Sequence, residues 1–265
     1  MKKSFNKILL LCRRNDKNVN KLINFFKRNS NKLILVWSKH PREKIKFSKY
    51  IFRNKFDYIV SYRNFHILKK NLIKQAKYAA INFHPSTPNY RGMGCINYAL
   101  FNNEQNYGST AHLIDVKIDH GKIIDVSRFS IKKKYSLNSL LSKTHDNMLI
   151  QAIKIFTFLK DDPANLYKMI KNSKDKRDKW SKKFFTREDM DKFYEVDNSI
   201  LYKNLLRKIK ACYMKDFRPY IMRHGFKFLL SSPAKEQYSK IANKKRYKMY
   251  FDAIPKDLKD EFNKN

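Results

Sequence analysis

Asn82 and His84 lie two residues apart at the end of an apolar run, directly before Pro85. In an extended strand, residues i and i+2 face the same side, so both side chains can point into one crevice. An imidazole, with an unperturbed pKa of about 6.5, can take or give a proton near neutral pH. A neighbouring amide can donate a hydrogen bond to an oxygen that becomes negative. The pair therefore predicts proton transfer combined with oxyanion stabilisation.

An acid that could orient the histidine follows 35 residues later, at Asp119 in the segment IDHGKII. We expect this segment to be a turn between two strands, from which the carboxylate could reach the same crevice. Taken singly, Asn-x-His is most often a strand end with a capping asparagine, and Asp-x-Gly is usually only a turn. An acid, an imidazole and an oxyanion donor together suit acyl transfer to an amine, and the combination favours this chemistry.

Two glycines, Gly92 and Gly94, follow in the segment NYRGMG, although the whole chain has only five glycines. Glycine lets a backbone approach another group closely, because it has no Cβ. We therefore predict a loop that closes over a ligand beside Asn82 and His84.

The elements that would position these residues alternate along the chain. Apolar runs, each expected to be a strand, occupy 7–12, 32–38, 56–62 and 78–84. Three segments between these runs are expected to be helical. The first has Val19, Leu22, Ile23 and Phe26 on one face, and the other two occupy 41–52 and 66–77. This order predicts an α/β fold with a mostly parallel sheet covered on both faces. The first run is followed by CRRNDKNVN and not by G-x-G-x-x-G, so we expect no dinucleotide site there.

A second set of elements follows the glycine-rich loop. The pattern predicts a helix near 95–104, strands at 108–115 and 122–131, and a long helix from Ser136, a good N-cap, to Leu159. This helix ends at KDDP, the clearest boundary in the chain. We expect a catalytic domain over 1–160 and an accessory region over 161–265.

The accessory region is expected to be mainly helical, with a single β-hairpin. Its predicted parts are a charge-dense connector at 171–183, a short helix with a Thr186–Asp189 capping box, an amphipathic helix over 200–213, a hairpin over 220–230 that turns at His224-Gly225, and one or two basic helices after Pro233.

The formal net charge of +36 at pH 7 allows two interpretations. One is a polyanionic partner, either nucleic acid or an anionic membrane surface. The other is compositional drift, because an excess of Lys, Asn and Ile is what an AT-rich coding sequence produces. Most of the 59 basic residues are lysine, whereas arginine binds phosphate better because its planar guanidinium can donate two hydrogen bonds at once. Drift is therefore the favoured interpretation.

The remaining composition points to a reducing cytoplasm and away from a membrane. Three cysteines stand far apart with no C-x-x-C pair, so neither a disulfide framework nor a zinc site is suggested. The apolar stretch 8–12 is shorter than the roughly 7–15 residues of an export signal, and no later run approaches the ~18 of a membrane span.

The motifs NFHPS, YRG, GSTAHLID and IDHGKII closely resemble those of the 10-formyltetrahydrofolate-dependent formyltransferase family. The matching residues are Asn82, His84, Pro85, Ser86, Arg91, Gly92, Gly108, Thr110, His112, Asp119 and Gly121. The resemblance covers roughly residues 5–160 and implies a Rossmann-like fold. STPNY departs from the Ser-Leu-Leu-Pro of many members, which concerns the loop over the substrate.

The resemblance implies a role for each matched residue. Asn82 would stabilise the oxyanion, His84 would move the proton, and Asp119 would hold His84 and help to pass the proton to the leaving nitrogen. The formyl donor, 10-formyltetrahydrofolate, would lie along Ser61, Tyr62, Arg63 and the backbone at Ile118. Candidates for binding the acceptor are Ser86, Tyr90, Arg91, Gly92 and Asn97. His112 is expected to be a packed, hydrogen-bonded strand residue.

Two acceptors and one non-catalytic alternative remain open within this resemblance. The layout after the long helix is most similar to nucleotide-sugar N-formyltransferases, so we favour a nucleotide-linked amino sugar made for a surface polysaccharide such as lipopolysaccharide. The charge favours a methionyl-tRNA formyltransferase-type activity on charged initiator tRNA. A non-catalytic, basic RNA-binding relative is the third alternative. Tyr220 and Phe228 of the hairpin could stack on a base, or the hairpin could form a homodimer interface.

Overall fold

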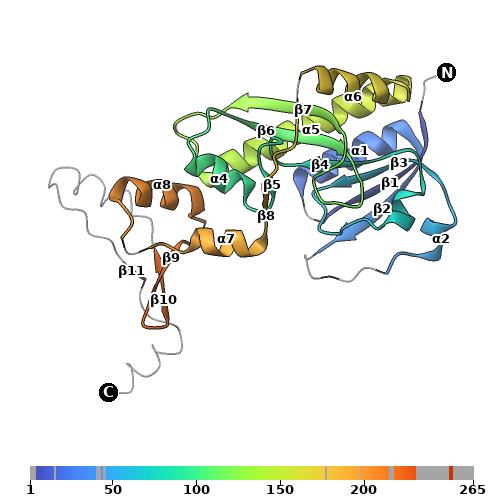
Figure 1. Cartoon of the computed structure of the whole chain (residues 1–265). Coiled ribbons are helices and arrows are strands. Elements are labelled where there is room, and N and C mark those ends of the chain that lie inside the picture. Colours follow the sequence, from blue (N-terminus) through green and yellow to red (C-terminus); the bar gives the residue numbers. More distant parts are fainter. Residues whose placement is uncertain are drawn as a thin grey trace. The chain divides into compact units, whose positions relative to one another are not determined.

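The apolar runs of the sequence form a single six-stranded sheet, with strand order β2-β1-β3-β4-β6-β7 (Figure 1). The strands are β1 (Phe5–Arg13), β2 (Ser30–Ser38), β3 (Phe56–Tyr62), β4 (Ala76–His84), β6 (Asn106–Leu113) and β7 (Ile123–Ser130). The first four strands in this order run parallel, and β6 and β7 are antiparallel to their neighbours. The prediction of a mostly parallel α/β sheet is confirmed.

The computed structural model describes residues 4–14, 16–39, 43, 46–176, 178–197, 199–214 and 218–230, with the backbone of β11 (Phe251–Asp252). The chain divides into two compact units. The first comprises 1–92, 105–132 and 141–184, and the second comprises 93–104, 133–140 and 185–265. The helices expected after Pro233 lie outside the described residues, and the two domains expected from the sequence remain a prediction.

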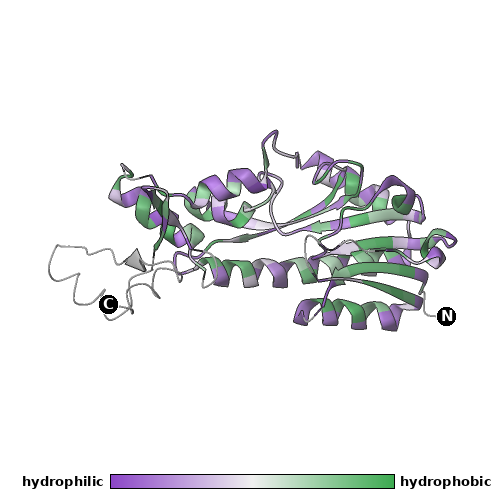
Figure 2. Cartoon of the chain, turned by 90° about the horizontal axis from the view of Figure 1, so that it is seen from below, coloured by the Kyte–Doolittle hydropathy of each residue, from purple (hydrophilic) through white to green (hydrophobic). Residues whose placement is uncertain are grey.

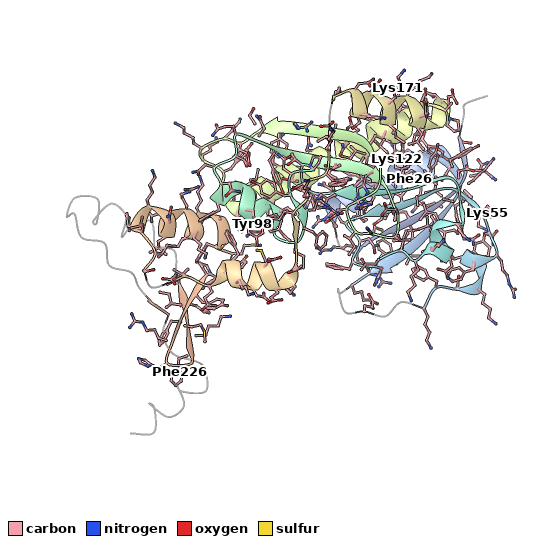
Figure 3. All side chains as sticks on the ribbon, in the orientation of Figure 1. Phe26, Lys55, Tyr98, Lys122, Lys171 and Phe226 are labelled. Atoms are coloured by element: carbon pink, nitrogen blue, oxygen red, sulfur yellow. The ribbon has the colours of Figure 1, made fainter. Side chains whose placement is uncertain are left out.

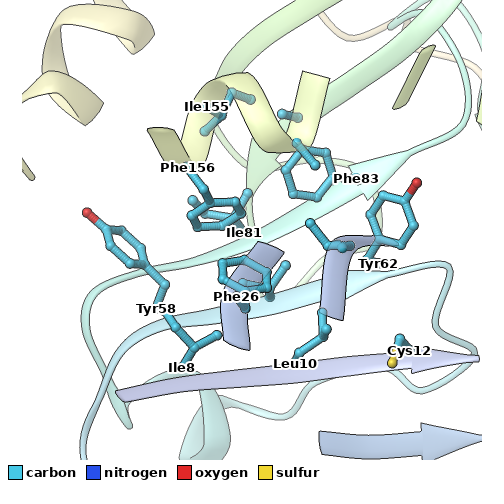
Figure 4. Packing of buried hydrophobic residues seen from close by; sticks show 14 of the residues in the cluster. Ile8, Leu10, Cys12, Phe26, Tyr58, Tyr62, Ile81, Phe83, Ile155 and Phe156 are labelled. Carbon is cyan, nitrogen blue, oxygen red and sulfur yellow. The ribbon is translucent and has the colours of Figure 1, made fainter. Parts of the chain in front are cut away.

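One face of the sheet is covered by α1 (Lys17–Asn29) and α5 (Leu137–Asp161). Figure 4 shows Ile8 and Leu10 of β1 directed at Phe26 of α1 and Phe156 of α5, whose ring centroids are 4.9 Å apart. The first turn of α1 is capped by Asp16, which accepts hydrogen bonds from two backbone N–H groups. Because alternate side chains of each strand are buried under α1 and α5, the side chains between them face the opposite side of the sheet.

The opposite face is covered by two short helices, α2 (Lys49–Phe52) and α3 (Lys70–Ile73), over Leu9 and Leu11. The strands are hydrophobic along most of their length, whereas hydrophobic and hydrophilic residues alternate along the helices (Figure 2). Within the described residues, the helix expected over 41–52 is reduced to α2, and the helix expected over 66–77 is reduced to α3. In the second case residues 76–77 belong to β4, where pairing with β3 prevails over a helical pattern.

The helix α6 (Asn165–Asp175) occupies the start of what the sequence suggested was a connector at 171–183. Leu166, Met169 and Ile170 pack against the core of the first unit, at the i, i+3, i+4 spacing of a helix face. The charges of 171–175 therefore lie on a helix, and only the later part of the segment is irregular.

Among its described residues, the second unit contains helices and the expected hairpin, whose second strand also pairs with β11. It contains α4 (Cys95–Phe101), α7 (Arg187–Tyr194), α8 (Tyr202–Cys212), β9 (Tyr220–Arg223) and β10 (Phe226–Leu230). The predicted capping box of Thr186 and Asp189 is present at the start of α7. The hairpin turns at His224 and Gly225, both with positive φ. Two short strands, β5 (Arg91–Gly92) and β8 (Phe184–Phe185), complete the described elements.

Candidate active site

The turn after β4 is held in place by residues of β6. The backbone N–H of Ser86 donates to the carbonyl of His84 (2.8 Å), so the chain turns sharply at Pro85. The Thr110 hydroxyl donates to the Ser86 carbonyl (2.7 Å), and the Tyr107 hydroxyl donates to the Pro85 carbonyl (3.1 Å). The neighbouring strand therefore supports the turn that presents His84.

Asn82 lies opposite His112 in the pair formed by β4 and β6, and the two side chains meet. Nδ2 of Asn82 is 3.0 Å from Nε2 of His112, and Nδ1 of His112 donates to the Leu113 carbonyl (2.8 Å). His112 is only 3% exposed. It is packed and hydrogen-bonded, as expected, and it also belongs to the cluster around Asn82.

Asp119 lies between two imidazoles. Its Oδ2 is 3.4 Å from Nδ1 of His84, and its Oδ1 is 3.6 Å from Nε2 of His112. Oδ2 also accepts a hydrogen bond from the backbone N–H of Gly92 (3.0 Å). All three side chains are buried. Asp119 and His84, which are 35 residues apart in the sequence, are thus in direct contact.

The surroundings of Asp119 keep it ionised. Burial on its own raises the pKa of a carboxyl, but His84, His112 and the Gly92 N–H favour the carboxylate and lower the pKa of Asp119 to about 2. Nε2 of His84 lies 2.8 Å from the Tyr90 carbonyl oxygen. Both ring nitrogens of His84 therefore face oxygen atoms that can accept a hydrogen bond, which fixes the orientation of the ring.

The turn that carries Asp119 has a left-handed backbone, with φ of 46° at Asp119, a conformation that Asp tolerates better than most residues. Arg91 holds this turn by donating to the carbonyls of Asp119 (2.6 Å) and Ile118 (3.3 Å). A Cβ at Gly121 would lie 1.8 Å from the Leu113 carbonyl oxygen. The Asp-x-Gly spacing is therefore needed for the turn to lie against β6.

The other residues predicted to bind the acceptor have differing surroundings. Ser86 is fully buried, and its hydroxyl has no hydrogen-bond partner among the described residues. Tyr90 and Gly92 touch the cluster through their backbone groups. Asn97 belongs to the second unit, where its amide donates to the Ala211 carbonyl (2.7 Å). A role for Asn97 in acceptor binding stays a prediction.

The residues predicted to lie along the folate are at the ends of β3 and in the 118–121 turn. Ser61 is in register with Asn82 in the neighbouring strand. Tyr62 is buried on the core side, whereas the Arg63 guanidinium forms an ion pair with Asp16. Ile118 is partly exposed and offers its carbonyl to Arg91. Their contact with a folate stays a prediction.

Trp180 is the residue of this site that the sequence interpretation missed. Its indole N–H donates to the Gly121 carbonyl (2.8 Å), and its ring packs against His84 and His112. The next residue, Ser181, accepts a hydrogen bond from Arg91 through its carbonyl (3.1 Å). The available signal was a single large aromatic within an otherwise charged stretch, DKWSKK.

A cavity of about 500 Å³ opens at the carboxyl ends of β1 and β2, lined by Arg13, Arg14, Ser38, Lys39 and Phe65. The Arg13 guanidinium lies 3.7 Å from the centroid of the Phe65 ring, and its Nε is buried with no hydrogen-bond partner among the described residues. Burial, and then the nearby Arg63, lower the pKa of Arg13 to about 10, so it stays charged at neutral pH. The cavity suits an anionic group.

The fold and the cluster agree with a match to a protein family. The family model described as formyl transferase matches residues 14–155, and the chain belongs to this family. The formyl donor of the family is 10-formyltetrahydrofolate.

The curated relatives match over a shorter stretch. The bifunctional polymyxin resistance protein ArnA of Wigglesworthia glossinidia brevipalpis is 35% identical over 100 residues, which are 37% of this chain and 15% of that protein. The methionyl-tRNA formyltransferase of Clostridium novyi is 34% identical over 96 residues, 36% of this chain and 30% of that protein. The matched part thus spans less than a third of either relative.

Solved structures with the same fold cover most of the chain. A sugar N-formyltransferase from a Shewanella species has a TM-score of 0.61 at 17% identity, covering 87% of this chain and 98% of its own. The N-formyltransferase from Helicobacter canadensis, in complex with folinic acid and dTDP-3-aminofucose, has a TM-score of 0.56 at 18% identity, covering 85% and 88%. At these identities the likeness shows the fold alone.

Proposed function

We propose that this chain transfers a formyl group from 10-formyltetrahydrofolate to the amine of a nucleotide-linked amino sugar, for a surface polysaccharide such as lipopolysaccharide. The observation that carries the proposal is the ionised Asp119 held between His84 and His112, with Asn82 beside them. Such a cluster combines a proton carrier, a fixed negative charge and an amide donor in one place.

Each side chain has a task in the proposed transfer. The amide nitrogen of Asn82 carries two hydrogens, of which the contact with His112 uses at most one. The other would donate to the formyl oxygen as charge develops on it. His84 would move the proton from the attacking amine towards the leaving nitrogen of the donor, while Asp119 stays ionised and orients the ring. The new bond joins the amine nitrogen to the formyl carbon, and the bond to the donor nitrogen breaks.

Asn82 is the residue of the cluster through which substrates would approach. Asn82 is partly exposed, whereas His84, His112 and Asp119 are buried behind it. Ligands of open α/β sheets bind outside the carboxyl ends of the strands, where Asn82 and His84 stand. Of the residues predicted to bind the formyl donor, Ser61 and Tyr62 end the adjacent strand β3 at the same edge, and Arg63 follows them.

The basic cavity supports an anionic acceptor. Arg13 follows Cys12, which is in register with Tyr62, and Tyr62 is in turn in register with Phe83. The cavity is therefore two strands away from β4, or about 10 Å at the usual spacing between strands. A nucleotide-linked sugar carries a diphosphate at about this distance from a ring amine, so one molecule could reach both places.

A second candidate function is formylation of charged initiator tRNA. Its support is the methionyl-tRNA formyltransferase of Clostridium novyi among the relatives and the net charge of +36. Lysines such as Lys55 and Lys171 are exposed and lie at the periphery of the first unit (Figure 3). A non-catalytic RNA-binding relative is a weaker third candidate, since a binding protein would not need the His84–Asp119 contact.

The test is release of tetrahydrofolate, followed by absorbance, with purified protein, 10-formyltetrahydrofolate and a dTDP-linked 4-amino-4,6-dideoxyhexose. Release that depends on the sugar is expected. If the donor binds and no sugar acceptor supports release, charged initiator tRNA becomes the next acceptor to test. If neither acceptor supports release, the catalytic assignment is wrong.

The proposal extends to where and in what form the protein works. Within the described ranges, no helix has both the length and the apolar composition that crossing a membrane requires. We propose a cytoplasmic enzyme, because the sequence shows no disulfide framework. We also propose a homodimer formed through the hairpin β9–β10, where Phe226 is 49% exposed.

A further inference from the structure

Trp180 lies against the residues on both sides of Asp119. The centroid of its ring is 5.1 Å from that of His112, at 89° between the planes, and 5.9 Å from that of His84, at 64°. These are edge-to-face contacts, which aromatic rings prefer to direct face-to-face stacking. One indole therefore restricts the rotation of both imidazoles.

The same side chain also holds the turn that carries Asp119. The indole N–H donates to the carbonyl of Gly121, two residues after Asp119 (2.8 Å). On its other side Gly121 lies against the Leu113 carbonyl, with no room for a Cβ. The end of the turn is thus fixed between β6 and Trp180.

The turn needs such support because its backbone is not in a relaxed state. Asp119 has φ of 46°, in the left-handed region that L-residues other than Asn and Asp rarely adopt. Arg91 contributes by bonding the carbonyls of Asp119 and of Ser181, the residue after Trp180. The segment 180–181 and the Asp119 turn are therefore tied together by two separate side chains.

We propose that Trp180 is a positioning residue for formyl transfer. It keeps the Asp119 carboxylate between the two imidazoles and keeps water away from their edges. The proposal rests on the proposed function, because Trp180 would act only through His84 and Asp119. A merely structural alternative is that Trp180 anchors the segment after α6 and has no effect on the cluster.

Two substitutions separate the hydrogen bond of Trp180 from its ring contacts. Trp180→Phe keeps an aromatic ring and removes the N–H, and Trp180→Leu removes both the ring contacts and the hydrogen bond. Loss of one hydrogen bond is expected to lower kcat about three- to tenfold in Trp180→Phe. Loss of the whole contact is expected to lower kcat on the order of 100-fold in Trp180→Leu, with KM changed much less. Phe129→Leu, at a half-buried aromatic of β7, is the matched control and is expected to keep kcat.

A second measurement does not depend on activity. The side-chain carboxyl of Asp119 is titrated by carbon-13 NMR in protein labelled at aspartate, with Asp119→Asn to assign its signal. In Trp180→Leu the imidazoles are free to move away from the carboxylate, whose pKa their contacts hold down, so the titration midpoint is expected to rise by about one pH unit from that of the wild type. Trp180→Phe and Phe129→Leu are expected to keep the wild-type midpoint.

The two measurements keep this proposal separate from the proposed function. If no acceptor is formylated by the wild type, the proposed function fails, and the NMR midpoint still decides whether Trp180 controls the environment of Asp119. A wild-type midpoint in Trp180→Leu would overturn the positioning role, whatever that variant's stability. So would an unchanged kcat in Trp180→Leu when the wild type is active.

Discussion

Asp119 is the residue on which the proposed chemistry depends, because it contacts His84, His112 and the Gly92 backbone at once. Asp119→Asn keeps the size of the side chain and removes its charge. We expect kcat to fall by on the order of 10³-fold or more, since His84 loses the group that orients it and stabilises its charged form. Steady-state kinetics in the tetrahydrofolate-release assay would measure this.

The matched control is Asp115→Asn, four residues earlier on the surface, where Asp115 pairs with the exposed His120. It should retain wild-type kcat. Near-normal turnover in Asp119→Asn, with its fold confirmed by circular dichroism, would contradict the assigned role.

The depressed pKa of Asp119 also predicts an effect on stability. Its folded-state pKa, about 2, lies below the unfolded value near 3.9. The carboxylate therefore contributes stability that is present above about pH 4 and is lost as the pH falls towards 2, amounting to about 2–3 kcal/mol. Urea unfolding between pH 5 and pH 2 should show a steeper loss for the wild type than for Asp119→Asn. Parallel curves for the two proteins would contradict the prediction.

The residues of the cluster differ in how readily the sequence reveals them. Asn82 and His84 share one strand end, so their spacing alone shows that they face the same side. Asp119 follows β6, which pairs antiparallel with β4, so its approach to His84 depends on a pairing between strands that are distant in the sequence. Trp180 reaches Gly121 from a segment without periodicity, 59 positions away, so no local pattern could have predicted that contact.

The elements that position the cluster were predictable where packing and local pattern agree. β1, β3 and β4 are apolar because both faces of the sheet are covered, and α1 carries one apolar stripe. The helix that became α3 was overestimated, because pairing with β3 takes residues 76–77, which also fit a helix, into β4. α6 was underestimated for the opposite reason: its lysines resemble a linker, and only its packing against the core of the first unit makes it a helix.

The Asp119 turn gives an element-scale prediction. Gly121→Ala would place a Cβ 1.8 Å from the Leu113 carbonyl oxygen, which is backbone and cannot move without shifting β6. We expect a loss of about 2–4 kcal/mol in the free energy of unfolding, from overpacking and a displaced strand. Activity should fall with it, because the same turn carries Asp119. Denaturant unfolding and the release assay measure the two effects.

Gly225→Ala is the control for this substitution. A Cβ there meets nothing within 4 Å, and the cost comes only from a positive φ of 80°, about 1 kcal/mol. Equal losses of stability in the two variants would show that the close approach at Gly121 is not what holds the turn.

At the scale of the whole molecule, the two candidate acceptors, a nucleotide-linked sugar and a tRNA, differ in which positive charges of the protein they would contact. A net charge of +36 attracts any polyanion through its phosphates, without selecting one. The cavity beside Arg13 is different, since it places a half-buried arginine, whose Nε is buried, beside Arg14 and Lys39 in one hollow. A nucleotide-linked sugar would use the cavity, whereas a tRNA would also engage the exposed lysines.

Binding to RNA should therefore depend on salt and not on sequence. We expect initiator tRNA and an unrelated RNA of equal length to bind with similar affinity, because spread-out lysines recognise only phosphate. For 6–10 phosphate contacts, affinity should fall about 10³- to 10⁵-fold between 50 and 200 mM salt. Formylation of the sugar nucleotide should change far less over this range, because a few buried contacts are screened less than surface charges. Fluorescence anisotropy with the two labelled RNAs, beside the release assay at each salt concentration, makes the comparison. Selective binding of initiator tRNA that persists at 200 mM salt would favour the tRNA acceptor and assign the charge a function.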